Sequence, residues 1–316
     1  MLPKVYWNFN IVVYRMISPI IFGGSGGRHL VVKVARLTGF ELGELTVKTF
    51  PDGETYVRFL NDVEGKDVII INSIYHKPND ILMELLLEIE TLKDLGAQKV
   101  IGVIPYFAYA RQDSRFNPGE AVSFEIVTRL LERAGLDEVY TIDLHLHRVE
   151  DISKMFKIPA YNLTAVRDLV KFISKHYRLE SPIIIGPDEE AEQWAKVAAD
   201  TLGVEYDVLE KKRISAEEVI IEARTTNVKG RDVIIVDDII STGGTMVEAI
   251  KALKRLGARN IIAACTHAIL AGDALYKVLK AGALDVIATD TIPSPISYVS
   301  VAPIIAEALK AKINKT

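Results

Sequence analysis

Short hydrophobic runs alternate with amphipathic segments along most of the chain. Runs rich in Ile and Val predict strands at residues 17–22, 68–74, 100–105, 138–144, 183–186, 206–209, 233–237, 261–266 and 286–288. Helical periodicity predicts helices at residues 29–37, 80–95, 122–134, 164–176, 189–202, 246–256 and 273–280. Because the strand runs are continuously apolar, they are typical of parallel strands buried on both faces. The pattern therefore predicts an α/β protein with doubly wound, mainly parallel sheets.

One six-residue pattern occurs twice. Leu-Lys-Asp-Leu-Gly-Ala at residues 92–97 and Leu-Lys-Arg-Leu-Gly-Ala at residues 253–258 each close a predicted helix before a predicted strand. A single match could arise by chance, because Leu-Gly is a common helix end. We interpret the chain as two related halves: an N-terminal domain over residues 17–160 and a C-terminal domain over residues 161–316. Residues 1–16 are treated as an extension, with Met1 and Met16 both open as translation starts.

Composition and charge narrow the class of protein. The 316 residues are 49% hydrophobic and 25% charged, which is typical of a folded protein of about two domains. A net charge of −4 provides no general attraction to nucleic acid or to an anionic membrane, and no apolar run reaches 18 residues. The single cysteine, Cys265, excludes an intrachain disulfide and favours a reducing compartment. We expect a cytoplasmic protein without nucleic-acid or membrane partners.

A candidate phosphate site follows the predicted strand at residues 233–237. Asp237 and Asp238 end the strand, and the turn before the next helix consists of Ser241, Thr242, Gly243, Gly244 and Thr245. Backbone N–H groups and hydroxyls at a helix N-terminus suit a phosphate monoester, and the two carboxylates suit sugar hydroxyls. The alternative is a capped helix start with solvated acids.

Several motifs together resemble one enzyme family. The segment from Asp237 to Thr245 is similar to the phosphoribosyl-binding signature of phosphoribosyltransferase-fold proteins. The segments at residues 50–58, 105–113, 141–145, 186–188, 265–267 and 289–293 occur in the order seen in ribose-phosphate pyrophosphokinases, also called phosphoribosyl pyrophosphate synthetases. The resemblance covers residues 17–310. It implies transfer of the β,γ-pyrophosphoryl group of ATP to the C1 hydroxyl of ribose 5-phosphate, giving phosphoribosyl pyrophosphate and AMP for nucleotide biosynthesis, with Mg²⁺ as cofactor.

The resemblance also implies roles for individual residues in the phosphate chemistry. Lys211 and Arg213, in the run Glu210-Lys-Lys-Arg213, match catalytic cations that neutralise charge on the transferred phosphates. The alternative is a solvated basic run after a strand. His145 and Asp188 match Mg²⁺-associated residues, although Mg²⁺ prefers oxygen ligands, so a water-mediated or phosphate-contacting role for His145 is equally open. His147 is treated as structural or solvated, and His267 as structural or pocket-lining.

The implied ATP-binding residues are divided between two segments. Arg111 and Gln112 match phosphate-contacting residues, and a guanidinium can form forked contacts. Phe50, Asp52 and Glu54 match the adenine-contacting loop, which in this family reaches the active site of a neighbouring subunit and so implies a homo-oligomer with shared active sites. Pro51-Asp-Gly53 is also an ordinary β-turn sequence, and both interpretations can hold together.

The chain departs from the family pattern at three places. Residues 186–191 read Gly-Pro-Asp-Glu-Glu-Ala where Ser-Pro-Asp-x-Gly-Gly is common, and Ser241 stands where Asp is common. Pro118-Gly119 replaces a Ser-Arg pair of the ADP and phosphate effector site, which puts control by ADP in doubt. Two rival functions remain: a phosphoribosyltransferase that consumes phosphoribosyl pyrophosphate, and a non-catalytic homologue. The presence of the catalytic cations and the paired acids argues against the non-catalytic homologue.

Overall fold

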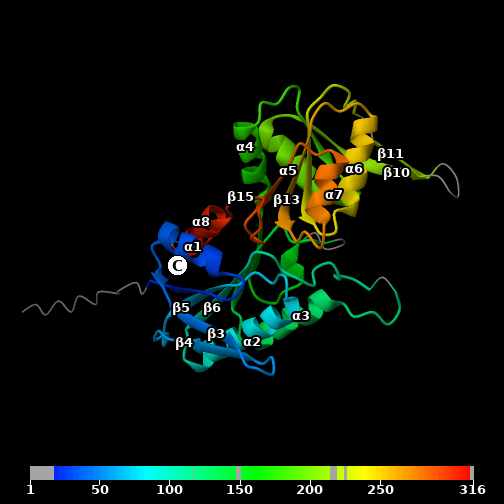
Figure 1. Cartoon of the computed structure of the whole chain (residues 1–316). Helices are drawn as coiled ribbons and strands as arrows, with labels where there is room; N and C mark the ends of the chain where they lie inside the picture. The colour runs from blue at the N-terminus through cyan, green and yellow to red at the C-terminus, as the bar shows by residue number, and fades with distance from the viewer. Residues whose placement is uncertain (1–17, 116, 147–150, 214–218, 224–225, 314–316) are drawn as a thin grey trace, which may run out of the picture.

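A computed structural model describes residues 18–115, 117–146, 151–213, 219–223 and 226–313 (Figure 1). Within this part of the chain lie the α-helices α1 (Arg28–Thr38), α2 (Pro78–Asp94), α3 (Ser123–Arg133), α4 (Val166–His176), α5 (Glu192–Leu202), α6 (Gly244–Arg255), α7 (Ala274–Ala281) and α8 (Ala302–Ile313). Two short 3₁₀ turns occur at η1 (Ile152–Lys154) and η2 (Glu189–Ala191). None of the helices in the described residues is long and apolar enough to cross a membrane.

The first sheet contains six parallel strands in the order β2-β1-β5-β6-β7-β8. They are β1 (Ile20–Gly23), β2 (Glu41–Leu42), β5 (Asp67–Ile71), β6 (Lys99–Ile104), β7 (Glu138–Ile142) and β8 (Ala160–Leu163). Successive strand residues face opposite sides, so Ile20 and Phe22 pack toward α2 and α3, whereas Ile21 packs toward α1 and α8. A hairpin of β3 (Leu45–Thr49) and β4 (Thr55–Phe59) lies apart from this sheet as a separate antiparallel pair.

The second sheet contains seven strands in the order β11-β10-β9-β12-β13-β14-β15. They are β9 (Ile183–Gly186), β10 (Glu205–Arg213), β11 (Val219–Ala223), β12 (Val233–Ile240), β13 (Ile261–Ala268), β14 (Asp285–Thr289) and β15 (Ser297–Val299). All pairings are parallel except that of β10 with β11. Helices α6 and α7 cover one face of this sheet, and α4 and α5 cover the other (Figure 1). The predicted doubly wound, mainly parallel architecture is therefore confirmed.

The two copies of the repeated hexapeptide adopt the same local structure. Gly96 and Gly257 have φ angles of 83° and 86°, the left-handed conformation that favours glycine. The N–H of Ala97 donates to Leu92 O, and the N–H of Ala258 donates to Leu253 O, both at 3.0 Å. Each copy ends a helix and leads into a parallel strand, β6 or β13. The repeat therefore marks corresponding helix-to-strand connections in the two halves.

From residue 160 onward, the chain contributes one strand to the first sheet and one helix that packs on it. Strand β8 is its edge strand and ends at Leu163. Helix α8, which the sequence pattern did not predict, packs with α1 on one face of the first sheet through Ile305 and Leu309. The C-terminal segment therefore returns to the N-terminal half of the molecule, and the division of the chain at residue 160 stays a prediction.

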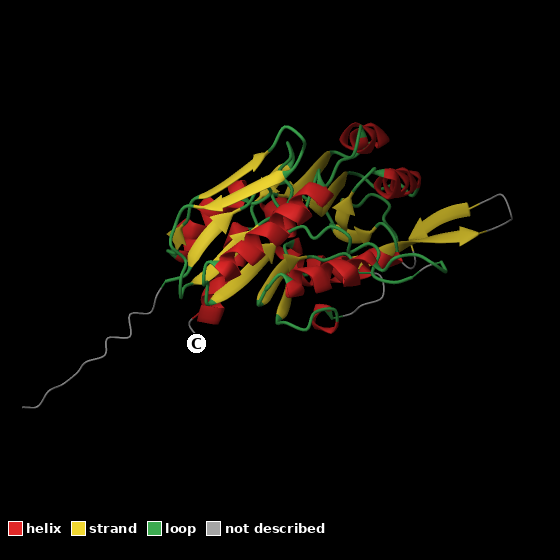
Figure 2. Ribbon diagram, turned by 90° about the horizontal axis from the view of Figure 1, so that it is seen from below, coloured by secondary structure: helices red, strands yellow, loops and turns green. Residues whose placement is uncertain are grey.

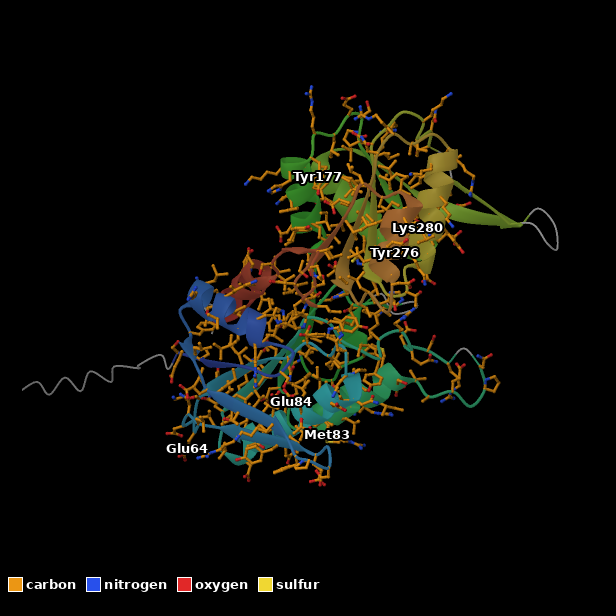
Figure 3. The ribbon with its side chains drawn as sticks, in the orientation of Figure 1. Glu64, Met83, Glu84, Tyr177, Tyr276 and Lys280 are labelled. Atoms are coloured by element: carbon orange, nitrogen blue, oxygen red, sulfur yellow. The ribbon has the colours of Figure 1, made fainter. Side chains whose placement is uncertain are left out.

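The loop after β1 covers a buried acidic pair on α2. Glu84, labelled in Figure 3, accepts a hydrogen bond from the backbone N–H of Ser25 (2.6 Å), and the Asn72 amide donates to both Glu84 (3.0 Å) and Glu88 (3.2 Å). Burial and the nearby Glu84 charge raise the pKa of Glu88 well above its ordinary value. A Cβ on Gly24 would lie 2.1 Å from Asn72 Nδ2, so the loop requires glycine at this position.

Candidate active site

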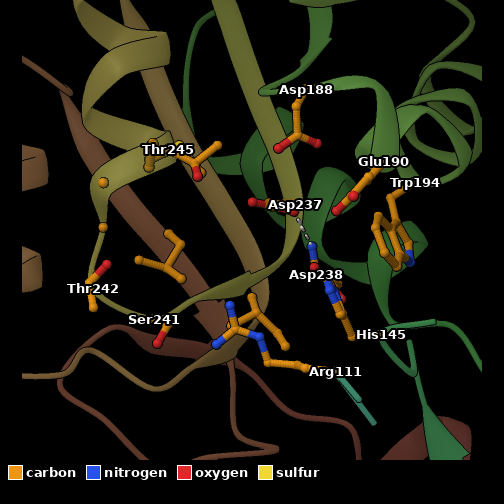
Figure 4. Close-up of a pocket in the computed structure, with 15 residues that line it drawn as sticks. Arg111, His145, Asp188, Glu190, Trp194, Asp237, Asp238, Ser241, Thr242 and Thr245 are labelled. Atoms are coloured by element: carbon orange, nitrogen blue, oxygen red, sulfur yellow. Dashed lines mark hydrogen bonds and ion pairs between the residues drawn. The ribbon is translucent and has the colours of Figure 1, made fainter. Parts of the chain in front are cut away.

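A cavity lies at the carboxyl end of β12, where ligands bind in open parallel sheets (Figure 4). Its walls come from the β12–α6 loop, the turn after β9, helix α5 and two loops of the first domain. The lining residues are Arg111, His145, Asp188, Glu190, Trp194, Asp237, Asp238, Ile239, Ile240, Ser241, Thr242, Gly243, Gly244, Thr245 and Met246. All seven predicted phosphate-site and sugar-site residues are therefore brought together in one cavity.

The β12–α6 loop has the form of an anion site. Helix α6 begins at Gly244, two residues earlier than predicted, so its first N–H groups border the cavity. Gly243 precedes the helix with a φ of 78°, and a Cβ there would lie 3.2 Å from Val278 Cγ2 on α7. Thr242 and Thr245 are exposed, so their hydroxyls are accessible to a ligand. The loop thus combines helix N–H groups with hydroxyls around one concave surface.

The paired carboxylates lie beside this loop in different environments. Asp238 is 1% exposed, and its Oδ2 lies 2.5 Å from Nδ1 of His145. Burial raises the pKa of Asp238 to about 8. Burial and the neighbouring Asp238 and Asp188 carboxylates raise the pKa of Asp237 well above its ordinary value. Both carboxylates therefore favour a partner that supplies positive charge or donates hydrogen bonds.

The two metal-associated candidates, His145 and Asp188, reach the same cavity from different domains. Burial and the Arg111 charge lower the pKa of His145 below its ordinary value, which favours a neutral imidazole. Burial and Glu190 raise the pKa of Asp188, which also accepts a hydrogen bond from Ala191 N at 3.3 Å. Among the described residues, no group of three or more His, Cys, Asp or Glu side chains is arranged to hold a metal ion. Any ion bound here would take much of its coordination from substrate and water.

Two cavity residues outside the β12–α6 segment were not singled out from the sequence. Glu190 and Trp194 lie on the cavity wall opposite the β12–α6 loop, as Figure 4 shows. The Trp194 ring is nearly parallel to that of His145, with an interplanar angle of 12° and centroids 6.4 Å apart. The unusual Glu189-Glu190-Ala191 sequence was a signal for Glu190, whereas Trp194 follows it by four residues, across the junction of η2 and α5.

Only one of the two residues that are predicted to contact the nucleotide phosphates, Arg111 and Gln112, lines the cavity. Arg111 lines it, but Gln112 does not, because the Gln112 amide donates to Ser114 O and to Glu120 Oε2, each at 3.2 Å. The buried His267 is also outside the main cavity, although it lines a small adjoining one.

The hairpin that carries Phe50, Asp52 and Glu54 does not contribute to the cavity within one chain. The predicted β-turn is confirmed: Gly53 N donates to Phe50 O at 2.9 Å, and Phe50 N donates to Glu54 O at 2.8 Å. Phe50 is 49% exposed, and its ring contacts Tyr56 edge to face with centroids 5.8 Å apart. The turn therefore presents an aromatic ring and two acids on the surface.

The predicted catalytic cations lie on β10, which forms a hairpin with β11 at the edge of the second sheet. The backbone of β10 pairs Lys211 with Ile221 and Arg213 with Val219 of β11. Figures 1 and 2 show these two strands projecting from the body of the domain. The side chains of Lys211 and Arg213, and all of His147, lie outside the described residues.

Comparisons with known proteins agree with this architecture. Residues 19–135 match the model of the N-terminal domain of ribose phosphate pyrophosphokinase, and residues 156–297 match that of the phosphoribosyl transferase domain. The chain is 45% identical over 291 residues to a ribose-phosphate pyrophosphokinase of Methanothermobacter thermautotrophicus, covering 92% of this chain and 100% of that protein. It is 42% identical over 291 residues to one from Methanopyrus kandleri, covering 92% of this chain and 98% of that protein.

A solved structure extends the similarity to the whole fold. The crystal structure of phosphoribosylpyrophosphate synthetase from Mycobacterium smegmatis superimposes with a TM-score of 0.85 at 31% identity, covering 95% of this chain and 100% of that one. Asp237 and Asp238 lie within β12, which runs on to Ile240, and meet the N-terminus of α6 in one cavity. With this arrangement and with similarity in both halves, the chain belongs to the ribose-phosphate pyrophosphokinase family.

Proposed function

We propose that this protein transfers the β,γ-pyrophosphoryl group of ATP to the C1 hydroxyl of ribose 5-phosphate, forming phosphoribosyl pyrophosphate and AMP for nucleotide biosynthesis. The observation that carries this proposal is the cavity in which residues 241–245 and the N-terminus of α6 adjoin Asp237 and Asp238. A phosphate monoester and a neighbouring sugar diol are the ligand chemistry that this arrangement suits.

In this proposal, the β12–α6 loop binds the 5-phosphate of the sugar. The N–H groups at the start of α6 and the hydroxyls of Ser241, Thr242 and Thr245 donate to the phosphate oxygens. Asp237 and Asp238 accept hydrogen bonds from the ribose hydroxyls, which offsets the burial that raises the pKa of both carboxyls. These contacts hold the sugar so that its C1 hydroxyl faces the nucleotide.

The triphosphate meets cations from two directions. Arg111 contacts it from the first domain, whereas Gln112 needs to leave its present hydrogen bonds to do so. Lys211 and Arg213 approach on the β10–β11 hairpin and neutralise the charge that develops on the transferred phosphates and on AMP. Pyrophosphoryl transfer is an in-line displacement in which a protein mainly positions and neutralises, so no covalent nucleophile is required.

The chemistry of the cavity wall fits Mg²⁺. Asp188 and Asp237 provide carboxylate oxygens, which Mg²⁺ prefers. Burial raises the pKa of both, with repulsion from Glu190 at Asp188 and from Asp238 and Asp188 at Asp237. We assign Asp188 as a Mg²⁺-associated residue and place the neutral His145 next to the ion's waters or to a phosphate. When bound, Mg²⁺ supplies charge neutralisation to the phosphates.

A second copy of the chain completes the proposed site. The surface turn with Phe50, Asp52 and Glu54 offers a stacking face and two acceptors for adenosine, but it lies outside the cavity of its own chain. We therefore propose a cytoplasmic homo-oligomer in which this turn serves the site of a neighbouring subunit. Native mass measurement tests the assembly, and a monomer with full activity would contradict the shared site.

A product assay tests the reaction. The protein is incubated with ATP, Mg²⁺ and ribose 5-phosphate, and AMP and phosphoribosyl pyrophosphate are quantified together. The proposal requires equal amounts of both products. Phosphoribosyl pyrophosphate consumed in the presence of a nucleobase would instead indicate a phosphoribosyltransferase, and an absence of turnover would indicate a non-catalytic homologue.

A further inference from the structure

A buried polar contact joins the two halves next to the segments that carry His145 and Asp238. The Thr266 hydroxyl on β13 donates to Oδ2 of Asp143, just after β7, at 2.7 Å. The backbone N–H of Ala165 donates to the same oxygen at 2.9 Å. Thr266 is 0% exposed and Asp143 is 2% exposed. A hydrogen bond in such a dry environment constrains the two chain segments strongly.

His267 forms a second contact between the same segments. Its Nε2 lies 2.9 Å from Ile142 O, and its Nδ1 lies 2.9 Å from the hydroxyl of Thr291. Because a carbonyl only accepts, Nε2 carries the proton and Nδ1 accepts from Thr291. Burial lowers the pKa of His267 to about 4, in agreement with a neutral ring. Thr289 donates to Thr266 O at 2.6 Å, which satisfies that carbonyl.

The contacts of Thr266 and His267 lie near both His145 and Asp238, whose side chains meet in the cavity. On the second sheet, β12 pairs with β13 so that Asp237 is opposite Cys265 and Ile239 is opposite His267. Thr266 is therefore level with Asp238, and His267 is level with the next residue, Ile239. On the first sheet, Ile142 and Asp143 come immediately before the segment that carries His145.

The backbone at Asp143 is held in an uncommon conformation. Its φ is 39°, and a non-glycine residue in this region costs on the order of 1–3 kcal/mol unless its surroundings hold it there. Asp143 N donates to Leu163 O at 2.8 Å, and the next N–H, of Leu144, donates to Asn162 Oδ1 at 3.0 Å. The turn then places His145 Nδ1 2.5 Å from Asp238 Oδ2. The direction of His145 thus depends on contacts made one and two residues earlier, by Leu144 and Asp143.

We propose that the Asp143–Thr266 hydrogen bond and the His267 contact position His145 against Asp238 across the domain boundary. Thr266 and His267 are positioning residues that act through His145 and touch no substrate. This inference rests on the proposed pyrophosphoryl transfer. It predicts that removing the Thr266 hydroxyl slows turnover while leaving the phosphate loop and ribose 5-phosphate affinity intact.

The first test compares three threonine variants of the full chain. Thr266→Val removes the hydroxyl with little change in volume, and Thr266→Ser retains it. Thr201→Val is the matched control, because the Thr201 hydroxyl donates to Val197 O at 2.7 Å within α5, away from the domain boundary. We expect Thr266→Val to lower kcat roughly 10- to 100-fold, the effect of about 1 Å of misplacement, with KM for ribose 5-phosphate within about twofold of wild type. Thr266→Ser and Thr201→Val should stay within about threefold of wild type in kcat.

A double-mutant cycle separates positioning from simple destabilisation. In a His145→Ala background, the further change Thr266→Val should alter kcat by less than about twofold, because the group that it positions is absent. A kcat loss of the same size in both backgrounds, or wild-type kcat in Thr266→Val, would overturn the proposal. Wild-type protein that makes no AMP would instead overturn the proposed function.

A second variant covers the case in which Thr266→Val does not fold. Thr291→Val removes the hydroxyl that donates to His267 without touching Asp143. The same kcat loss, with unchanged KM for ribose 5-phosphate, is expected. Emission from Trp194, measured in a Trp7→Phe background, should also shift, because its ring lies parallel to His145. Wild-type kcat together with wild-type Trp194 emission would overturn the inference.

Discussion

The conformation of Gly243 offers the most direct test of the phosphate loop. This residue precedes α6 with a φ of 78°. A Cβ at this position would lie 3.2 Å from Val278 Cγ2 and 3.3 Å from Ala274 O, so α7 would have to move by a few tenths of an ångström. The substitution Gly243→Ala therefore introduces both backbone strain and crowding at the base of the loop.

The size of the effect follows from the strain. An L-residue in a sparsely populated left-handed region costs on the order of 1–3 kcal/mol. If the variant keeps the native loop, this cost appears as a lower free energy of unfolding. If the loop moves to relieve the strain, the cost appears as weaker binding of ribose 5-phosphate, by about 5- to 150-fold for 1–3 kcal/mol. The two losses together should amount to about 1–3 kcal/mol.

Denaturant unfolding measures the loss in free energy of unfolding, and titration with ribose 5-phosphate measures the loss in binding affinity. Gly244→Ala is the matched control, because Gly244 has no positive φ and the nearest atom to its Cβ would be Thr242 Oγ1 at 3.8 Å. Alanine is favoured over glycine in a helix, so the control should be equally or slightly more stable, by up to about 1 kcal/mol. Wild-type stability and wild-type affinity in Gly243→Ala, or equal losses in both variants, would refute the reasoning.

Three further predictions concern charge. Lys211→Ala should retain ATP binding in titration while kcat falls about 10²–10³-fold, and wild-type turnover would refute its role. Removing Mg²⁺ with excess chelator should abolish AMP formation, whereas an unchanged rate would count against metal dependence. Burial and the Glu84 charge raise the pKa of Glu88 in the folded state. The protonated Glu88 side chain therefore contributes to the free energy of unfolding at low pH, and this contribution is lost as the pH rises through the raised pKa. Glu88→Gln should therefore flatten the decline of Tm with rising pH, whereas Glu90→Gln, at an exposed position, should not. Equal slopes of Tm against pH in the wild type and both variants would contradict this.

The alternation of strands and helices was predictable because each element carries its own periodicity. Strands such as Val233–Ile240 begin with a buried apolar run, here Val233 to Val236, and helix α6 shows one apolar face. Helix α8 was missed because Ala302–Ile313 is apolar on most sides, so its sequence contains no clear period. Its place on α1 of the first domain depends on a long-range contact that no local pattern encodes.

The same distinction applies to the site. Asp237, Asp238 and residues 241–245 are close in the sequence, so a strand, a turn and a helix start suffice to bring them together, and their chemistry could be inferred from spacing. His145 and Asp238 are 93 positions apart, and Asp143 and Thr266 are 123 apart. Their contacts exist only because two sheets pack with one relative placement.

The sequence by itself therefore determined the two-sheet class, the phosphate loop and the resemblance to a family. The tertiary structure alone decided that Arg111, Glu190 and Trp194 share the cavity and that the Phe50 turn does not. The physical reason is that local backbone preferences act over a few residues, whereas the direction of a side chain into a shared cavity depends on packing between distant segments.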